Sequence, residues 1–223
     1  MLTANGELGI YTTDETENLL TGEITVEVEK LAVPFDPPPG RESPAFLKLA
    51  GTANFLYLIW SDGYAIRFDA RDEERAEAAE TFDLTPDAGS ITRVQYMIGK
   101  TTLLVGSDTG SVQAWFPTRP DGAETIDGIV TVKAHEMQGP ASPVTTLGAS
   151  ARSRLAVAGH ADGTVRLLLV SAADEVARVS VPTGAAIEAA VVSSKEGGIV
   201  AQSARQLVGW ELRAGPPDAS NRA

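Results

Sequence analysis

The chain has 223 residues, of which 43% are hydrophobic, and this is enough for one sizeable domain with a packed core. Its 30 acidic and 18 basic residues give a net charge of −12, which argues against a nucleic-acid or anionic-membrane partner, and the absence of cysteine excludes disulfides, thiolate metal ligands and cysteine nucleophiles. No run reaches the roughly 20 apolar residues of a membrane-spanning helix, and the start has no signal-peptide pattern. We therefore expect either a cytoplasmic protein or a piece of a longer chain.

The amino-terminal region predicts a fragment of β-structure followed by a connector. The stretch "LTANGELGIY" (2–11) is typical of two short strands around a turn at Asn5, and "EITVEVEKL" (23–31) is typical of an outer strand. The run "VPFDPPPGRESP" (33–44) is rich in proline, which has no N–H to donate within a central strand. We therefore expect a loop at 33–44.

The first complete repeat is "LYLIWSDGYAIRF" (56–68), which reads as two strands around an Asp-Gly turn. The next segment, "DARDEERAEAAETF" (69–82), is highly charged and rich in helix-forming residues. It predicts a solvated loop or a short helix in the place where an outer strand would otherwise lie. A partner-binding helix is the alternative for this segment.

Two further copies of the hairpin follow, "LLVGSDTGSVQAWF" (103–116) and "LAVAGHADGTVRLLL" (155–169). A degraded copy, "GIVAQSARQLVGWEL" (198–212), has lost the Asp-Gly turn. Apolar residues alternate with a period of two after each turn, which indicates half-buried strands. The expected inner strands are 90–100, 143–153 and 185–197, and the expected outer strands are 128–136 and 174–181.

A hairpin that recurs at about 40 to 50 residues is typical of a β-propeller, in which each blade is a small antiparallel sheet. We therefore predict an all-β, propeller-like fold with about four to five antiparallel blades, which would form an incomplete ring. Residues 1–212 would form a single domain and 213–223 a disordered tail. The open blade edges predict either a missing stretch upstream of Met1 or self-association across those edges.

The segment 134–170, "AHEMQGPASPVTTLGASARSRLAVAGHADGTVRLLLV", resembles a WD repeat. His135 matches the His that precedes the inner strand in that pattern, and Asp162 with Gly163 matches its turn. The Trp that closes the pattern is Trp115 in the preceding copy, whereas Leu168 stands here. The resemblance implies a divergent WD-repeat β-propeller in which these residues are structural.

A longer run, 101–168 within the region 46–212, is similar to the extracytoplasmic insert of the permease subunits of bacterial phosphate ABC transporters. The resemblance implies a non-catalytic periplasmic domain of a membrane protein whose flanking helices are absent from this chain. Such a domain would serve phosphate import through contacts with other transporter subunits or a substrate-binding protein. We expect recognition residues in the loops 69–82 and 117–127. The alternative is a free-standing cytoplasmic WD-like scaffold that binds a protein or peptide.

Motifs that carry chemistry are weak in this chain. The stretch "GKTT" (99–102) ends like a phosphate-binding loop, but Val94 stands where that motif needs a glycine, and the repeat places the stretch in a turn between strands. We expect His135 to pack inside its blade and His160 to be a surface contact at the rim. The sequence therefore predicts no catalytic residue, no cofactor and no metal site.

The acidic and aromatic residues of the repeats also have structural explanations. Asp62, Asp108 and Asp162 stand at equivalent turn positions, where an Asp side chain accepts hydrogen bonds from backbone amides of its own turn. The three tryptophans stand at the ends of repeat strands, where we expect them to fill the gaps between blades. They are Trp60, Trp115 and Trp210.

Overall fold

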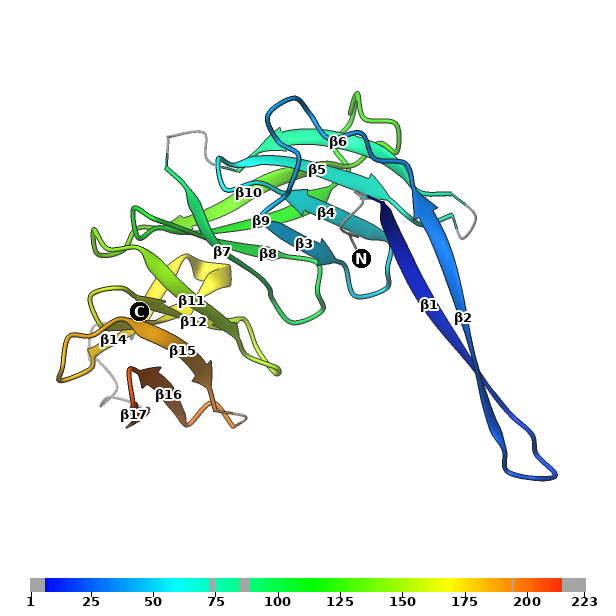
Figure 1. Ribbon diagram of the computed structural model, residues 1–223. Helices are drawn as coiled ribbons and strands as arrows, with labels where there is room; N and C mark the ends of the chain where they lie inside the picture. The colour runs from blue at the N-terminus through cyan, green and yellow to red at the C-terminus, as the bar shows by residue number, and fades with distance from the viewer. Residues whose placement is uncertain (1–6, 73–74, 85–88, 194, 214–223) are drawn as a thin grey trace, which may run out of the picture. The chain divides into compact units, whose positions relative to one another are not determined.

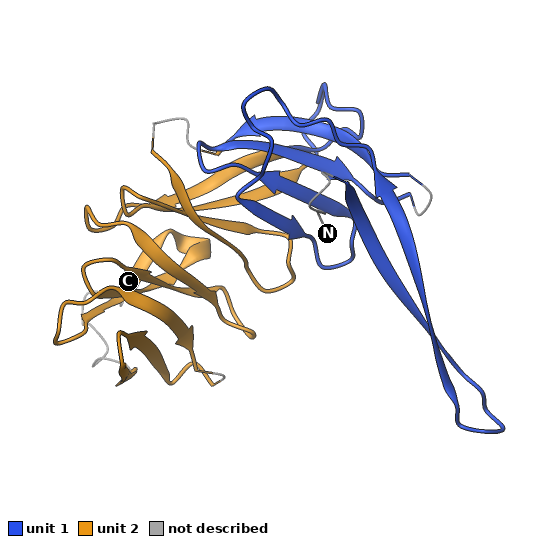
Figure 2. Ribbon diagram, viewed as in Figure 1, with its two compact units in different colours: residues 1–83, 119–130 blue, residues 84–118, 131–223 orange. Residues whose placement is uncertain are grey.

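The computed structural model describes residues 7–72, 75–84, 89–193 and 195–213, and it is built almost entirely of β-strands (Figure 1). The contacts between Cα atoms divide the chain into two compact units (Figure 2). Unit 1 contains residues 1–83 and 119–130, and unit 2 contains residues 84–118 and 131–223. Asn5 and the tail after residue 213 lie outside the described residues, so the interpretations of a turn at Asn5 and of a disordered tail are not addressed by the structure.

Unit 1 contains a two-stranded sheet and a four-stranded sheet. Strands β1 (Leu8–Glu17) and β2 (Ile24–Val33) pair with each other without a register shift. The second sheet has the order β3-β4-β5-β6, with β3 (Phe46–Leu49), β4 (Phe55–Ile59), β5 (Tyr64–Asp69) and β6 (Glu77–Asp83). The connector predicted at 33–44 lies between β2 and β3, so that prediction is confirmed.

The prediction of a loop or helix at 69–82 is wrong for its second half, because residues 77–83 form the outer strand β6. The pairing of β6 with β5 places Glu80 directly opposite Arg67, and both side chains are buried. An unpaired edge of β5 and an uncompensated buried guanidinium would both be unfavourable. The pairing with β5 and the buried contact with Arg67 therefore outweigh the helix propensity of the glutamates and alanines in this segment.

Unit 2 contains two four-stranded sheets and one three-stranded sheet within the described residues. The strands are β7 (Ile91–Tyr96), β8 (Leu103–Ser107), β9 (Val112–Thr118), β10 (Val130–Met137), β11 (Val144–Ala149), β12 (Leu155–His160), β13 (Thr164–Leu169), β14 (Asp174–Ser180), β15 (Ile187–Val192), β16 (Gly198–Ser203) and β17 (Gln206–Glu211). Each sheet is an antiparallel meander in chain order. The predicted inner, outer and hairpin strands from residue 90 onward are therefore confirmed, and Gly99 with Lys100 lies in the turn between β7 and β8.

The inner strands β7, β11 and β15 follow one another across unit 2, and equivalent contacts join them. The Thr92 hydroxyl donates to the Val144 carbonyl at 2.7 Å, and the Thr145 hydroxyl donates to the Ile187 carbonyl at 2.5 Å. Gly106 and Gly159 leave room at the same junctions, because a Cβ there would lie 2.6 Å from Val144 and 2.5 Å from Ile187. The repeat in the sequence is thus a repeat of the packing between sheets.

Candidate functional site

The predicted turn residues Asp62 and Asp162 each accept a hydrogen bond from the amide two positions later. The carboxylate of Asp62 lies 3.2 Å from the Tyr64 nitrogen, and that of Asp162 lies 3.0 Å from the Thr164 nitrogen. Asp62 also binds the guanidinium of Arg41, whose hydrogen bonds lower the pKa of that carboxyl. Both side chains are therefore used in holding their own sheet's turn.

Asp108 is not equivalent to these two residues, and the prediction that all three share one turn position is wrong. Gly110 donates to the Ser107 carbonyl as Gly163 donates to His160, so Thr109 occupies the position of Asp162. Asp108 stands one residue earlier and accepts from the Ser90 nitrogen at 2.9 Å instead. The longer "SDTG" spacing carries this signal, because Thr109 stands between Asp108 and Gly110, whereas Asp162 directly precedes Gly163.

Of the two histidines, His160 is the more deeply buried. His160 is completely buried at the end of β12, so the prediction of a surface contact is wrong. Its Nδ1 lies 3.0 Å from the Ser142 carbonyl, while its Nε2 has no hydrogen-bond partner within the part of the chain that the structure describes. Burial lowers the pKa of His160, which favours the neutral ring. His135 on β10 is only half-buried.

The tryptophans contribute to packing more than to any open surface. Trp115 is buried and its indole N–H donates to the Gln113 side chain at 2.9 Å. Trp60 is also buried, and its indole N–H donates to the Arg41 carbonyl at 2.9 Å. Trp210 is half-buried and packs against the core of the last sheet. Such pairing is expected of a buried indole, which combines an apolar ring with one polar group.

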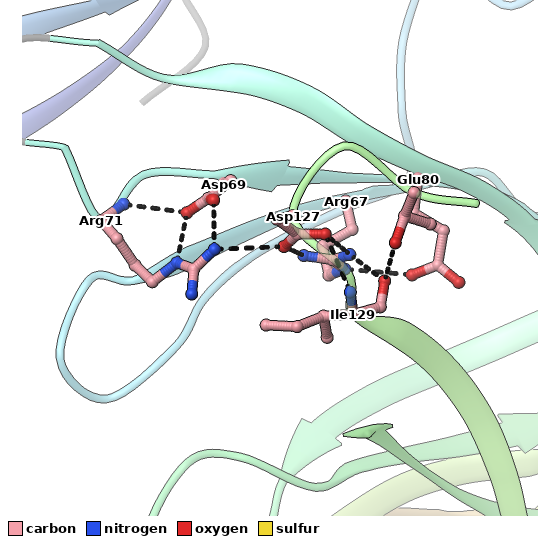
Figure 3. Close-up of polar contacts among 7 residues, drawn as sticks. Arg67, Asp69, Arg71, Glu80, Asp127 and Ile129 are labelled. Carbon is pink, nitrogen blue, oxygen red and sulfur yellow. Dashed lines mark hydrogen bonds and ion pairs between the residues drawn. The ribbon is translucent and has the colours of Figure 1, made fainter. Parts of the chain in front are cut away.

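Figure 3 shows a buried ion-pair network in unit 1 around Arg67, which the sequence did not reveal. The Arg67 Nε donates to Glu80 at 3.0 Å, and its two terminal nitrogens donate to the Asp127 carboxylate at 2.6 and 3.0 Å. A further hydrogen bond of 2.6 Å reaches the Ile129 carbonyl. Burial by itself opposes the charged guanidinium, but the hydrogen bonds to Asp127 and Glu80 raise the pKa of Arg67. Burial likewise opposes ionisation of Asp127, yet its bonds with Arg67 and the Ile129 amide lower the pKa of that carboxyl.

Asp127 lies at the end of the segment 117–127 that we expected to carry recognition residues. Its carboxylate is buried and bound on both oxygens, and Arg71, which also binds Asp69, approaches it at 3.6 Å. The network holds one fully buried cation between two buried carboxylates, so its charges are compensated and its donors are used. We therefore assign it a structural role.

An open pocket of about 430 Å³ lies in unit 2 beside His135. Apolar side chains of Met97, Ile98 and Phe116 line it, and its polar side chains are those of Thr102, His135, Arg154 and Ser171. Arg154 is exposed and has no carboxylate partner among the described residues. Apolar walls with one unpaired cation are suited to a peptide side chain or terminus that combines an apolar part with a carboxylate.

The part of the chain that the structure describes contains no group of three or more His, Asp or Glu side chains that could hold a metal ion. Nor does any described helix have the length and apolar character needed to cross a membrane.

The comparisons with known proteins show the fold. No protein-family model matches the chain, and no curated protein matches its sequence. A chain in the crystal structure of the mitotic checkpoint complex is similar with a TM-score of 0.56 at 13% identity, over 77% of this chain and 47% of that one. The β-propeller domain of Cps50 (Swd1) from Myceliophteria thermophila is similar with a TM-score of 0.64 at 13% identity, over 84% of this chain and 61% of that one.

The chain thus spans about half of the first of these structures and about three-fifths of the second. At this level of identity the likeness concerns the fold and not the activity. The predicted all-β, propeller-like architecture is confirmed by these neighbours together with the meander sheets. The chain therefore has a β-propeller-like fold.

Proposed function

We propose that the chain is a non-catalytic protein-interaction domain. The observation that carries this proposal is that the one buried cluster of charge described in unit 1, around Arg67, is saturated by its own hydrogen bonds and ion pairs. A general acid or base needs a free lone pair or proton within reach of a substrate, and this network offers neither. Rigid sheets with loops and apolar patches at the surface are instead suited to binding another protein.

We further propose that this domain acts on the extracytoplasmic side of a membrane, as part of a phosphate ABC-transporter permease-like protein. The resemblance of residues 46–212 to the outer insert of those permeases supports this proposal. The strongly acidic composition also fits a surface that remains soluble and does not adsorb to anionic lipids. Other transporter subunits or a substrate-binding protein would then be the partners, and phosphate import would be served by these contacts.

Biolayer interferometry with the full chain and the phosphate-binding protein of the same organism tests this proposal. We expect saturable binding with a dissociation constant of about 1 to 100 μM, which is typical of a transient contact. A sugar-binding protein of similar size and charge serves as the control. If the phosphate-binding protein and the control give the same signal, the transport proposal is contradicted.

The second candidate is a free-standing cytoplasmic WD-like scaffold that binds a peptide, and the pocket beside His135 favours it. A peptide that ends in an apolar residue with a free carboxylate would place its side chain against Phe116 and its charge beside Arg154. Titration of such peptides, followed by NMR of the two histidines, tests this function. We expect shifts at His135 that disappear in Arg154→Ala and persist in the neighbouring control Arg152→Ala. Equal binding by both variants would contradict it.

A further inference from the structure

The two-stranded sheet of β1 and β2 is an arm of which one end is fixed in unit 1 (Figure 1). Leu8, Ile10 and Val33 at its base are buried in the same apolar cluster as Leu56 and Phe68 of the four-stranded sheet. Residues 11–30, by contrast, have almost entirely exposed side chains. The arm is therefore held at its base and free over most of its length.

Residues 11–30 are the exposed part of the arm, and Ile24, Val26 and Val28 form an apolar stripe on one of its two faces. Ile24, Val26 and Val28 alternate along β2 with exposed fractions of 62%, 52% and 63%. Their cross-strand partners are Glu17, Glu15 and Thr13, which lie on the same face because directly opposed residues of an antiparallel pair point to the same side. A row of exposed apolar side chains on an otherwise charged ribbon is typical of an interaction site.

The tip of the arm adds two more apolar side chains. Leu19 and Leu20 are 91% and 97% exposed. Asn18 closes the turn that presents them. Its side-chain oxygen accepts from the backbone nitrogens of Leu20 and Thr21 at 3.0 and 3.3 Å, and its backbone N–H donates to the Glu23 carbonyl at 2.8 Å. The leucines are thus displayed on a hydrogen-bonded turn.

The opposite face of the arm is turned toward its own unit. Thr12, Asp14 and Glu29 line a groove of about 490 Å³ together with the 52–54 and 70–71 segments. The apolar stripe lies on the other face, which leaves it available to a second molecule.

The charge of the arm defines the chemistry of its partner. Residues 11–30 contain six carboxylates and one basic residue, Lys30, which already pairs with Glu7 at 3.4 Å. Glu15 and Glu17 stand directly beside the stripe, so groups that cover the stripe must also meet these charges. A second copy of this chain carries the same net charge of −12 and would be repelled.

We propose that the arm docks on a partner protein whose surface has an apolar groove flanked by Lys and Arg side chains. The stripe and the two tip leucines fill the groove, and the flanking cations pair with the carboxylates of Glu15 and Glu17. The inference rests on the protein-interaction half of the proposed function and does not depend on phosphate transport.

A labelled ten-residue strand peptide, Val-Ser-Lys-Ser-Val-Ser-Lys-Ser-Val-Ser, is the probe, because its valines and lysines alternate along one face and its serines lie on the other. Its binding to the full chain is measured by fluorescence anisotropy at low and high salt. The test variant is Ile24→Thr/Val26→Thr/Val28→Thr, since threonine keeps the strand preference while adding a hydroxyl. The matched control is Val176→Thr/Val191→Thr, two valines of unit 2 that are 52% and 55% exposed.

We expect the test variant to bind at least about tenfold more weakly than the wild type, and the control to bind as the wild type does. Glu15→Gln/Glu17→Gln should weaken binding at low salt and reduce its salt dependence. The proposal would be overturned if the test variant bound the peptide as tightly as the wild type does. It would also be overturned if a peptide with glutamate in place of lysine bound as tightly as the basic peptide. A dimer in sedimentation velocity that the test variant abolishes would overturn it too, since the occupant would then be a second copy. If the basic peptide binds as expected and the phosphate-binding protein does not, only the transport half of the proposed function fails.

Discussion

Buried arginines show most clearly how single residues stabilise this protein. Arg67 and Arg166 have almost no exposed surface, although a guanidinium is strongly hydrated in water. Arg67 is compensated by two buried carboxylates and a carbonyl. Arg166 binds Glu175 and the Gln138 carbonyl, and one of its terminal nitrogens has no partner in the described part of the chain. Arg67 is therefore the residue whose removal leaves the larger uncompensated charge.

Replacing Arg67 with methionine should destabilise the protein by about 3 to 5 kcal/mol, because Glu80 and Asp127 would remain buried without their cation. Urea unfolding followed by tryptophan fluorescence measures this change in the free energy of unfolding. The control is Arg71→Met, in which a partly exposed ion pair with Asp69 is lost at a cost of at most about 1 kcal/mol. Equal losses in the two variants would contradict the role assigned to the network.

Gly110 and Gly122 separate the effect of steric crowding from that of backbone strain. Both have positive φ angles, +90° and +76°, which cost alanine about 1 to 2 kcal/mol relative to glycine. A Cβ at Gly110 would lie 1.9 Å from the Pro140 oxygen, whereas one at Gly122 would meet nothing within 4 Å. We expect Gly110→Ala to lower the free energy of unfolding by more than about 4 kcal/mol. Gly122→Ala should lower it only by the cost of the backbone strain, about 1 to 2 kcal/mol. Thermal unfolding of both variants tests this, and similar melting temperatures would contradict it.

His160 should make stability depend on pH. Its pKa is lowered by burial from the value of 6.5 expected in the unfolded chain, so the unfolded state takes up the proton first as the pH falls. The neutral ring contributes fully to the stability of the folded protein above pH 6.5. This contribution is lost as the pH falls below that value toward the pKa of His160 in the folded state. Urea unfolding at pH 7.5 and 5.5 should show a smaller loss of stability in His160→Gln than in the wild type or in His135→Gln. If His160→Gln loses as much stability between these two pH values as the wild type does, this account is contradicted.

Secondary-structure elements were predicted well where the repeat is regular and poorly where context decides. The alternation after Asp62 and Asp162 predicts hairpins, and these form. Strand β6 could not be found by the same means, because its charged, helix-forming sequence is held extended by pairing with β5 and by the buried contact of Glu80 with Arg67. The burial of His160 was missed for a similar reason: the sequence shows that it precedes a turn, but not which side of the strand is covered.

The arm of β1 and β2 should be the least stable of the described hairpins. A two-stranded ribbon without a covered face is marginally stable in water, and only the base of this one is packed. In hydrogen–deuterium exchange, amides of residues 12–29 should exchange well before those of β12 and β13. Equal protection in the two hairpins would contradict this expectation, because it would require the arm to be covered in the free protein.

The fold class of the whole molecule was accessible from the sequence because the same hairpin recurs and each copy obeys the same local rules. The function was less accessible, since most residues that recur, such as Asp62, Asp162 and Trp115, are bound within their own turns or cores. The surfaces that we assign to binding do not recur. The exposed stripe of the arm depends on strand register, and the pocket beside His135 depends on segments that are distant in the sequence.

Site-specific photocrosslinking in the native host tests the central claim, that this chain is a protein-interaction domain. A benzophenone side chain would replace Val26 on the arm, Phe116 at the pocket or Val191 as the control. The account predicts that a single protein is crosslinked from Val26 or Phe116 but not from Val191, and that the purified protein binds the wild-type chain more tightly than the variants of that surface. No specific crosslink from either surface, together with turnover of a small-molecule substrate by the purified chain, would contradict it.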